Sequence, residues 1–412
     1  MKTLQNQNHY HIATLPNGLR VVVSDHADDV SYIGVAVNAG SRDEDDRHQG
    51  LAHFVEHTIF KGTRHRRSWH ISNRMESVGG ELNAYTTKEE TLIYTNTPAG
   101  HVDRALELLS DLIMNSVFPP AELDKEREVI IEEIHSYEDS PSDAVYDQFE
   151  EQIYRGCGLS HNILGTPESV RALTSQDARS FIERNYTPGN MVIYCVDRED
   201  PEKNLRRIER YFGKLDFPDI SRDRTPAPAV TPFDIVRNED SRQANTIVGT
   251  RLFGRTDPRR YALFLLNNYL GGPCMNSRLN LELRDKRGLV YTVEGNVSLM
   301  SDTGLLLFYF GSDTRTVGKC RDIIIRELER TASKEMTDAS FTRIREQYCG
   351  QLILSSDHRE SRAMSLAKSL LYYNEVLDSR HAADMIRKVT PADLRDMARL
   401  VLDSGLSTLT LT

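Results

Sequence analysis

The sequence predicts an α+β protein made of two homologous domains, each a mainly antiparallel sheet covered by helices. Its 412 residues are enough for two domains. The order strand, polar loop, helix occurs at residues 30–60 and again at 244–272. In both halves a glycine then leads into a β-rich run, at 79–97 and at 288–312. Chance likeness between alternating strands and helices is the alternative to a duplicated domain.

A proline-rich, charged stretch at residues 216–234 separates the halves. Prolines disfavour both helices and central strands, so we expect a linker at 218–232. The linker would join a first domain, 1–217, to a second domain, 233–412. Amphipathic stretches predict helices that cover one face of each sheet, at 103–116 and 317–333.

Composition and charge limit the partners and the compartment. The formal net charge is −10 with a pI near 5.8, which argues against a nucleic acid or an anionic membrane as partner. No apolar run reaches membrane-spanning length, and the first residues lack the apolar core of a secretory signal. The five cysteines are scattered without a CxxC pair, so a reducing, cytoplasmic location is expected.

The stretch HFVEHTIF, residues 53–60, predicts a metal site on a helix. His53 and His57 are four residues apart, so both can face one ion from the same side of the helix. Glu56 lies beside them and could take a proton from a zinc-bound water. Two surface histidines next to a glutamate are the alternative. The apolar surroundings favour the metal site, because unpaired polar groups are costly to bury.

A third ligand is expected from LDKEREVIIEEIHSYEDS, residues 123–140. Glu126 and Glu133 are seven residues apart and share one face of the predicted helix, whereas Glu132 falls on another face. One carboxylate of this pair could bind zinc while the other supports the site. A glutamate pair with this spacing is more often a solvated surface. The apolar side of the helix is predicted to contain Val129 together with Ile130, Ile131 and Ile134.

The sequence resembles the pitrilysin/insulinase family of zinc metallopeptidases. It is most similar to the short-chain bacterial members that are akin to the mitochondrial processing peptidase β subunit. The likeness extends over nearly the whole chain and rests on GLAHFVEHTIFKGT (50–63), VGGELNAYTTKEETLIY (78–94), EREVIIEEI (126–134) and LRDKRGLVY (283–291). The resemblance implies an inverted-zincin fold in which the two domains form a half-shell.

The resemblance also implies roles for single residues. His53 and His57 would bind one zinc ion per chain, and Glu133 would be the third ligand. Glu56 would be the general base. Glu126 matches an acidic residue that supports catalysis in a role left open.

Four further residues carry expected roles in substrate binding and catalysis. Asn83 and Ala84 match an edge strand that pairs with an extended substrate backbone; an ordinary edge strand is the alternative. Arg284 and Tyr291 match a pair from the second domain, in which a hydroxyl can stabilise an oxyanion and an arginine can hold a carbonyl. Arg287 is a nearby alternative whose spacing fits less well.

The resemblance therefore predicts a zinc-dependent endopeptidase or oligopeptidase that cleaves peptides and unfolded segments inside a chamber closed by a second half-shell. That second half-shell would be an identical chain, although a hetero-partner of the same family is possible. The first alternative is a non-catalytic or partner-dependent subunit, and a metal-dependent hydrolase of other substrates is the second. Residues 271–279 depart from the family's glycine-rich loop through Pro273 and Cys274, which leaves substrate access open.

Overall fold

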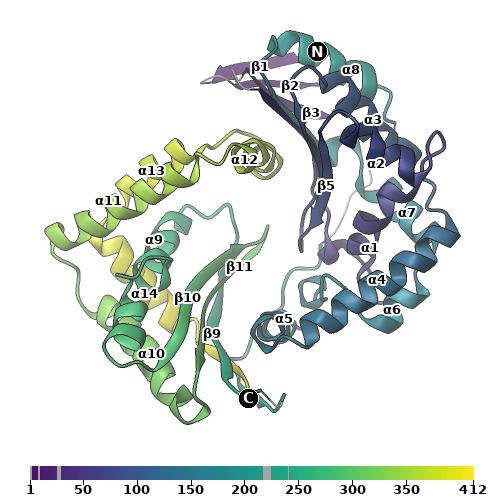
Figure 1. Ribbon diagram of the computed structural model, residues 1–412. Coiled ribbons are helices and arrows are strands. Elements are labelled where there is room, and N and C mark those ends of the chain that lie inside the picture. The colour runs from purple at the N-terminus through teal and green to yellow at the C-terminus, as the bar shows by residue number, and fades with distance from the viewer. Residues whose placement is uncertain (1, 8–9, 26–28, 217–223, 240) are drawn as a thin grey trace. The chain divides into compact units, whose positions relative to one another are not determined.

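The computed structural model describes all residues except 1, 8–9, 26–28, 217–223 and 240. The chain divides into two compact units, and each has a sheet covered by helices (Figure 1). Unit 1 consists of Met1–Ile134, His161–Thr225 and Ser356–Asp378. Unit 2 consists of His135–Ser160, Pro226–Ser355 and Ser379–Thr412. The predicted α+β class with two sheet-containing parts is confirmed.

Unit 1 contains a seven-stranded sheet in the order β1-β2-β3-β7-β4-β6-β5. Only the β3–β7 pair is parallel among the described strands; the other neighbours are antiparallel. The strands are β1 (Lys2–Gln7), β2 (Tyr10–Thr14), β3 (Arg20–Asp25), β4 (Val30–Val37), β5 (Glu81–Thr86), β6 (Thr91–Pro98) and β7 (Met191–Asp197).

One face of this sheet packs against most helices of the unit and forms its main core. Val35 and Ile193 on the strands belong to the same buried cluster as Phe54, Leu109 and Ile130 on the helices. The helices are α1 (Leu51–Thr58), α2 (Ser68–Glu76), α3 (Val102–Asn115), α4 (Pro120–Glu138), α6 (Pro167–Ala172), α7 (Ser175–Asn185) and α8 (Pro201–Phe212), with short helices η1 (Ser41–Asp43), η2 (Ile59–Lys61) and η4 (Pro188–Asn190).

The opposite face of the same sheet is covered by one helix, α12 (Arg359–Tyr373). Val192 and Tyr194 point to this side, where they pack with Leu366 and Leu370 of α12. Because side chains alternate along a strand, β7 supplies Ile193 to one layer and Val192 to the other. Every residue of β7 is buried for this reason.

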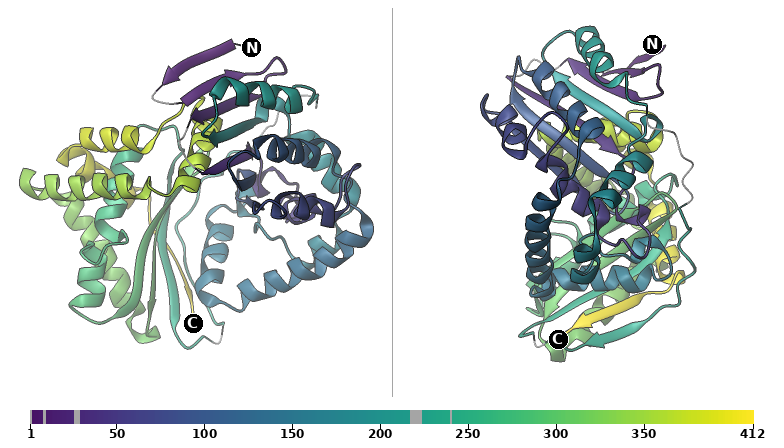
Figure 2. Two further views of the ribbon diagram at one scale, coloured as in Figure 1. Left: turned by 45° about the horizontal axis from the view of Figure 1, so that its top comes forward. Right: turned by 90° about the vertical axis from the view of Figure 1, so that its right-hand side faces the viewer.

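Unit 2 contains a five-stranded sheet in the order β10-β11-β9-β12-β8. Its described pairs are antiparallel except β8 with β12, and Figure 2 shows the C-terminal strand β12, in yellow, along the same sheet. The strands are β8 (Asp234–Arg237), β9 (Ala244–Phe253), β10 (Val290–Leu299), β11 (Thr303–Ser312) and β12 (Ser407–Leu411).

The helices of unit 2 also lie on both faces of their sheet. Phe308 and Phe310 face the larger layer, whereas Leu307 and Tyr309 face α5 (Pro141–Ile153). The larger layer contains α9 (Arg260–Gly271), α10 (Val317–Ser333), α11 (Asp338–Ser355), α13 (Ser379–Lys388) and α14 (Pro391–Asp403). The short helices of the unit are η3 (Gly158–Ser160), η5 (Asn280–Asp285, a π-helix) and η6 (Thr314–Thr316).

Each unit takes one helix from the other half of the sequence. Helix α5 follows α4 in the first half but packs in unit 2, and α12 follows α11 in the second half but packs in unit 1. The compact units are therefore not contiguous in sequence. The domain bounds 1–217 and 233–412 remain a prediction from the sequence. The predicted linker at 218–232 lies partly outside the described residues; residues 224–232 form neither helix nor strand.

Most predicted elements occur close to their expected bounds. The stretches 103–116 and 317–333 correspond to α3 and α10. The assignment of Val129 to the apolar side of α4 was wrong, because this side chain is 51% exposed while Ile130, Ile131 and Ile134 are buried. Among the described residues, no helix combines the length and apolar character needed to cross a membrane.

Candidate metal centre

Helix α1 begins at a residue whose backbone requires glycine. Gly50 has φ +85°, and a Cβ there would approach the carbonyl oxygen of Leu164 to 2.5 Å. The buried carboxylate of Glu44 accepts hydrogen bonds from the backbone N–H groups of Gly50 (2.9 Å) and Ala52 (2.7 Å). Burial raises the pKa of Glu44, and the two backbone donors oppose that shift. Glu44 thus caps α1, a contact that the sequence analysis missed.

The metal-binding residues predicted from sequence lie together where α1 meets α4 in unit 1 (Figure 1). Their ligand atoms all lie within 4.8 Å of one another. Oε2 of Glu133 is 3.7 Å from Nε2 of His53 and 3.5 Å from Nε2 of His57. Two ligands about 2.0 Å from one zinc ion in tetrahedral geometry are about 3.3 Å apart. The two measured separations lie close to this value, so the three side chains can converge on one zinc ion.

Burial keeps His53 in the protonation state that a metal ligand needs. The residue is 6% exposed. Desolvation, with a smaller contribution from the nearby His57, lowers its pKa to about 3. Its Nδ1 atom has no hydrogen-bond partner within the described part of the chain. A neutral imidazole offers a lone pair to a metal, so the buried ring of His53 suits coordination.

Glu126 is not part of the cluster of ligand atoms, but it contacts His57 at the ring nitrogen opposite the one that faces Glu133. Its Oε2 is 3.4 Å from Nδ1 of His57, while the Nε2 of that ring faces Glu133. The other oxygen of Glu126 is 2.6 Å from Nζ of Lys61, directly after α1 in η2. Carboxylates in this position orient a metal-binding histidine and fix its tautomer. Lys61 was not singled out by the sequence analysis, although it is four residues after His57.

Glu56 is half-buried on α1 between the two histidines in sequence. Burial raises the pKa of its carboxyl group, and the negative charge of Glu133 adds to the shift. The side chain of Thr86, the nearby His57 and the backbone of Thr86 oppose this shift in the pKa. A raised pKa makes this carboxylate a better proton acceptor, which is the property required of a general base.

The strand β5, which contains Asn83 and Ala84, forms one edge of the sheet in unit 1. It pairs only with β6 among the described strands, with Asn83 opposite Tyr94 and Ala84 opposite Ile93. The side-chain oxygen of Asn83 accepts the backbone N–H of Ala84 at 2.8 Å. This bond occupies a main-chain donor on the edge strand, so a second strand that uses the donor must displace the Asn83 side chain.

Arg284 and Tyr291 lie together in unit 2, where the guanidinium carbon of Arg284 is 5.6 Å from the centre of the Tyr291 ring. The Tyr291 side chain is 80% exposed. Arg287 is held by Glu282 through its side-chain oxygen (2.5 Å) and its carbonyl (2.6 Å). Arg287 is therefore paired with Glu282, whereas Arg284 is exposed and stacks near Tyr291.

The loop at 271–279, which departs from the family pattern, is fastened to α11 by side chains. Asn276 and Gln347 exchange two hydrogen bonds, at 2.9 and 3.1 Å. Gln351 donates to the sulfur of Cys274 at 2.8 Å. The loop thus has a defined conformation within unit 2.

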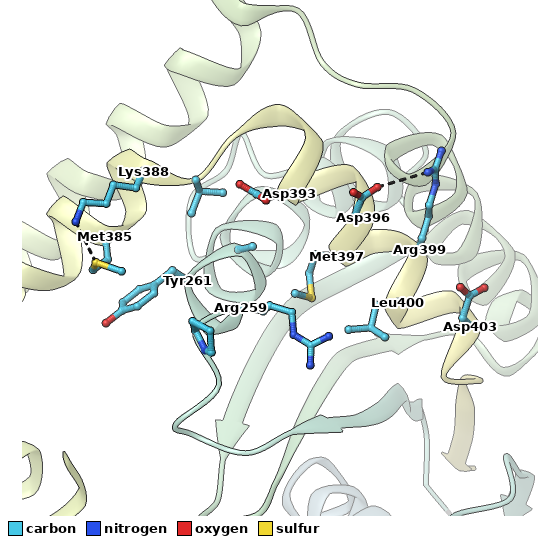
Figure 3. Close-up of a pocket in the computed structure, with 13 residues that line it drawn as sticks. Arg259, Tyr261, Met385, Lys388, Asp393, Asp396, Met397, Arg399, Leu400 and Asp403 are labelled. Atoms are coloured by element: carbon cyan, nitrogen blue, oxygen red, sulfur yellow. Dashed lines mark hydrogen bonds and ion pairs between the residues drawn. The ribbon is translucent and has the colours of Figure 1, made fainter.

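Unit 2 also has a cavity of about 580 Å³ between the start of α9 and helices α13 and α14 (Figure 3). Its floor includes Tyr261 and Met397, and its charged groups lie at the rim. Asp396 pairs with Arg399 (3.4 Å), and Lys388 contacts the sulfur of Met385. No histidine or cysteine is among its lining residues in the described structure, so this cavity lacks the ligand set found at α1 and α4.

The fold and the site define a two-part α+β protein with a centre of two histidines and one glutamate that is suited to zinc. Residues 20–167 match the insulinase family, peptidase family M16, and residues 172–348 match the peptidase M16 inactive domain. The chain belongs to the M16 peptidase family.

Relatives with known sequences match over most of their length. An uncharacterized zinc protease of Streptomyces coelicolor is 34% identical, with 94% of this chain and 86% of that protein covered. YmxG of Bacillus subtilis, also named an uncharacterized zinc protease, is 31% identical over 89% of this chain and 88% of its own. A probable mitochondrial-processing peptidase subunit beta of Arabidopsis thaliana is 29% identical over 94% and 75%.

Two crystal structures share the fold at low sequence identity. A protease from Helicobacter pylori has a TM-score of 0.91 at 23% identity and covers 98% of this chain and 99% of its own. A peptidase M16 inactive domain from Pseudomonas fluorescens has a TM-score of 0.89 at 16% identity, with 98% of both chains covered. These likenesses confirm the fold.

The cap on α1 leads to the first prediction. Glu44→Ala removes the acceptor for two buried N–H groups, and we expect a loss of about 1–2 kcal/mol of unfolding free energy. Glu44→Gln keeps one carbonyl acceptor and should lose less. Denaturant unfolding followed by circular dichroism measures both variants. Equal stability of wild type and Glu44→Ala would show that the cap does not stabilise α1.

Proposed function

We propose that this chain is a zinc-dependent endopeptidase or oligopeptidase that hydrolyses peptides and unfolded polypeptide segments. The observation that supports this most is the convergence of His53, His57 and Glu133, with Glu56 on the same helix as the histidines. The family membership and the relatives named zinc proteases agree with it. Expression of the chain, followed by incubation with a mixed peptide library with and without a chelator, tests the proposal.

His53, His57 and Glu133 would hold one zinc ion per chain. When bound, zinc supplies a Lewis acid that polarises the scissile carbonyl and makes a water more acidic. Glu56 takes a proton from the attacking water and passes it to the leaving amine. Glu126 orients the ring of His57, and Lys61 in turn holds Glu126. This assigns Glu126 a positioning role rather than a ligand role.

Substrate binding would involve the edge strand β5. An extended peptide can pair with the edge of β5 near Asn83 and Ala84 when the Asn83 side chain leaves the Ala84 N–H, which gives affinity from main-chain bonds without strict sequence preference. Arg284 and Tyr291 would contribute a carbonyl contact and an oxyanion donor. By resemblance to the family, they would act on the zinc centre of a second, identical chain. The cytoplasmic location stays a prediction.

The role of Glu56 can be tested without removing the metal ligands. We expect Glu56→Gln to retain zinc and to lose turnover by about 10²–10⁴. Metal content measured by atomic absorption serves as the control for an intact centre. Near-wild-type turnover of a zinc-loaded Glu56→Gln protein would assign the base to another residue. Zinc binding without any peptide cleavage by the wild type would favour a non-catalytic subunit.

The third ligand can be distinguished from its sequence neighbour. Glu133→Gln should weaken zinc binding and activity together, since it replaces a charged oxygen ligand at the centre. Glu132→Gln is the matched control, because that side chain is exposed and absent from the cluster among the described residues. Titration of each variant against a zinc-chelating dye measures the affinity. A larger loss for Glu132 than for Glu133 would contradict the assignment.

The action of Arg284 and Tyr291 between chains predicts complementation. Glu56→Gln chains and Tyr291→Phe chains should each be nearly inactive alone. After free exchange about half of the dimers are mixed, and each mixed dimer contains one site without a defect, so about a quarter of wild-type activity should return. If the pair acts within one chain, no activity returns. A fully active monomer at assay concentration would also contradict this arrangement.

A further inference from the structure

A basic and aromatic segment lies exposed on unit 1 outside the metal centre. Residues 64–70 read RHRRSWH and include Trp69, the single tryptophan of the chain. Its side chain is 68% exposed. A tryptophan offers a large apolar area that is usually covered in folded proteins, and exposed aromatic surface commonly marks a contact site. His70 is also exposed, and its ring centre is 5.1 Å from that of Trp69.

The backbone that carries these side chains is held in a defined turn. Gly62 and Arg67 form an antiparallel bridge, and the N–H of Thr63 donates to the carbonyl of Arg66 at 2.8 Å. The Thr63 hydroxyl oxygen accepts the N–H groups of His65 (3.1 Å) and Arg66 (2.9 Å). A partner that binds here would meet a preformed surface and would lose little free energy in ordering it.

The nearby carboxylates are already paired within this turn and α3. Arg66 contacts Glu107 (2.6 Å) and Asp111 (2.5 Å), and Nδ1 of His65 is 2.7 Å from Asp111. Arg64 and Arg67 are both exposed, and neither side chain contacts a carboxylate within the described structure. The segment therefore presents two unpaired guanidinium groups and one exposed indole ring within residues 64–69.

We propose that this basic–aromatic surface, made of Arg64, Arg67, Trp69 and His70, docks an acidic polypeptide segment. A guanidinium group binds a carboxylate through two parallel hydrogen bonds, so Arg64 and Arg67 match acidic side chains of a partner. Tryptophan and arginine are also the residue types that contribute most to protein–protein contacts. Trp69 would cover an apolar side chain of the segment, while the two arginines fix its charged groups.

The number of unpaired charges favours a peptide over other polyanions. Recruitment to an anionic membrane typically uses clusters of about 4–8 basic residues. Nucleic-acid binding proteins commonly neutralise about 6–10 phosphates. Two unpaired arginines fall short of both, and the formal net charge of −10 opposes long-range attraction to either surface. A short acidic segment needs only a few local contacts.

The single tryptophan allows a direct test on the full-length chain that does not depend on catalysis. The probe is a synthetic peptide of about twelve Glu and Leu residues, with a Lys and Leu peptide as control. We expect the Glu peptide to shift the Trp69 emission to shorter wavelength, since covering the indole removes water. Mass spectrometry confirms that the peptide remains intact during the measurement. No shift with the Glu peptide, or an equal shift with the Lys peptide, would overturn the proposal.

Matched variants assign the binding to this surface. Anisotropy of a fluorescein-labelled Glu peptide measures affinity in every variant, including Trp69→Ala. The Arg64→Ala/Arg67→Ala double variant should bind on the order of tenfold more weakly. Arg47→Ala/Arg206→Ala removes the same charge from other exposed positions of unit 1 and should bind like wild type. Equally weak binding of the peptide by both double variants would indicate an effect of net charge and contradict the assignment of binding to this surface.

Competing polyanions complete the test. Vesicles with anionic lipids and a single-stranded oligonucleotide are titrated against the same Trp69 emission. We expect neither to shift it at concentrations where the Glu peptide does. A response to vesicles or to the oligonucleotide at lower concentration than to the Glu peptide would identify a membrane or a nucleic acid as the partner and overturn the proposal. That result would leave the proposed peptidase activity unaffected, because no step of catalysis uses these residues.

Discussion

The contact of α1 with α4 across His53, His57 and Glu133 is the constraint on which the rest of unit 1 depends. Helix α1 places Phe54 and Val55 in the main core, so its histidines cannot turn to solvent without taking these two side chains with them. A buried imidazole without a partner costs free energy. A metal ion shared with α4 would offset that cost and join the two helices.

The surroundings of this centre fix each of its parts by a separate contact. Glu44 accepts the backbone N–H of Gly50 where α1 begins. At the other end, Glu126 contacts the ring of His57 and is itself held by Lys61, which lies just after α1. Exposure rises from the buried His53 to Glu133, whose side chain is 34% exposed. The centre therefore has a rigid inner side and an outer side that water or a substrate can reach.

The second half of the chain repeats the order of strand, loop and helix, but its helix α9 (Arg260–Gly271) contains no histidine. Helix α9 occupies the place in the element order that α1 has in the first half, and it contains Asn267 and Asn268 among mainly apolar residues. Asn267 donates to the carbonyl of Gly295, and Asn268 donates to Gln351. The NH2 groups of both side chains are therefore bound within unit 2. The match of residues 172–348 to a peptidase M16 inactive domain agrees with this.

The sequence by itself determined the fold class, the helix with His53 and His57, and the choice of Glu126 and Glu133 as partners, because periodicity and spacing are local properties of a chain. Tertiary structure alone decided which helix covers which sheet, since α5 and α12 cross to the opposite units and no local pattern records that. It also decided the exposure of Val129, and it brought Glu44 and Lys61 to the site. The Lys61–Glu126 contact joins two segments that are far apart in sequence, so no local pattern predicts it.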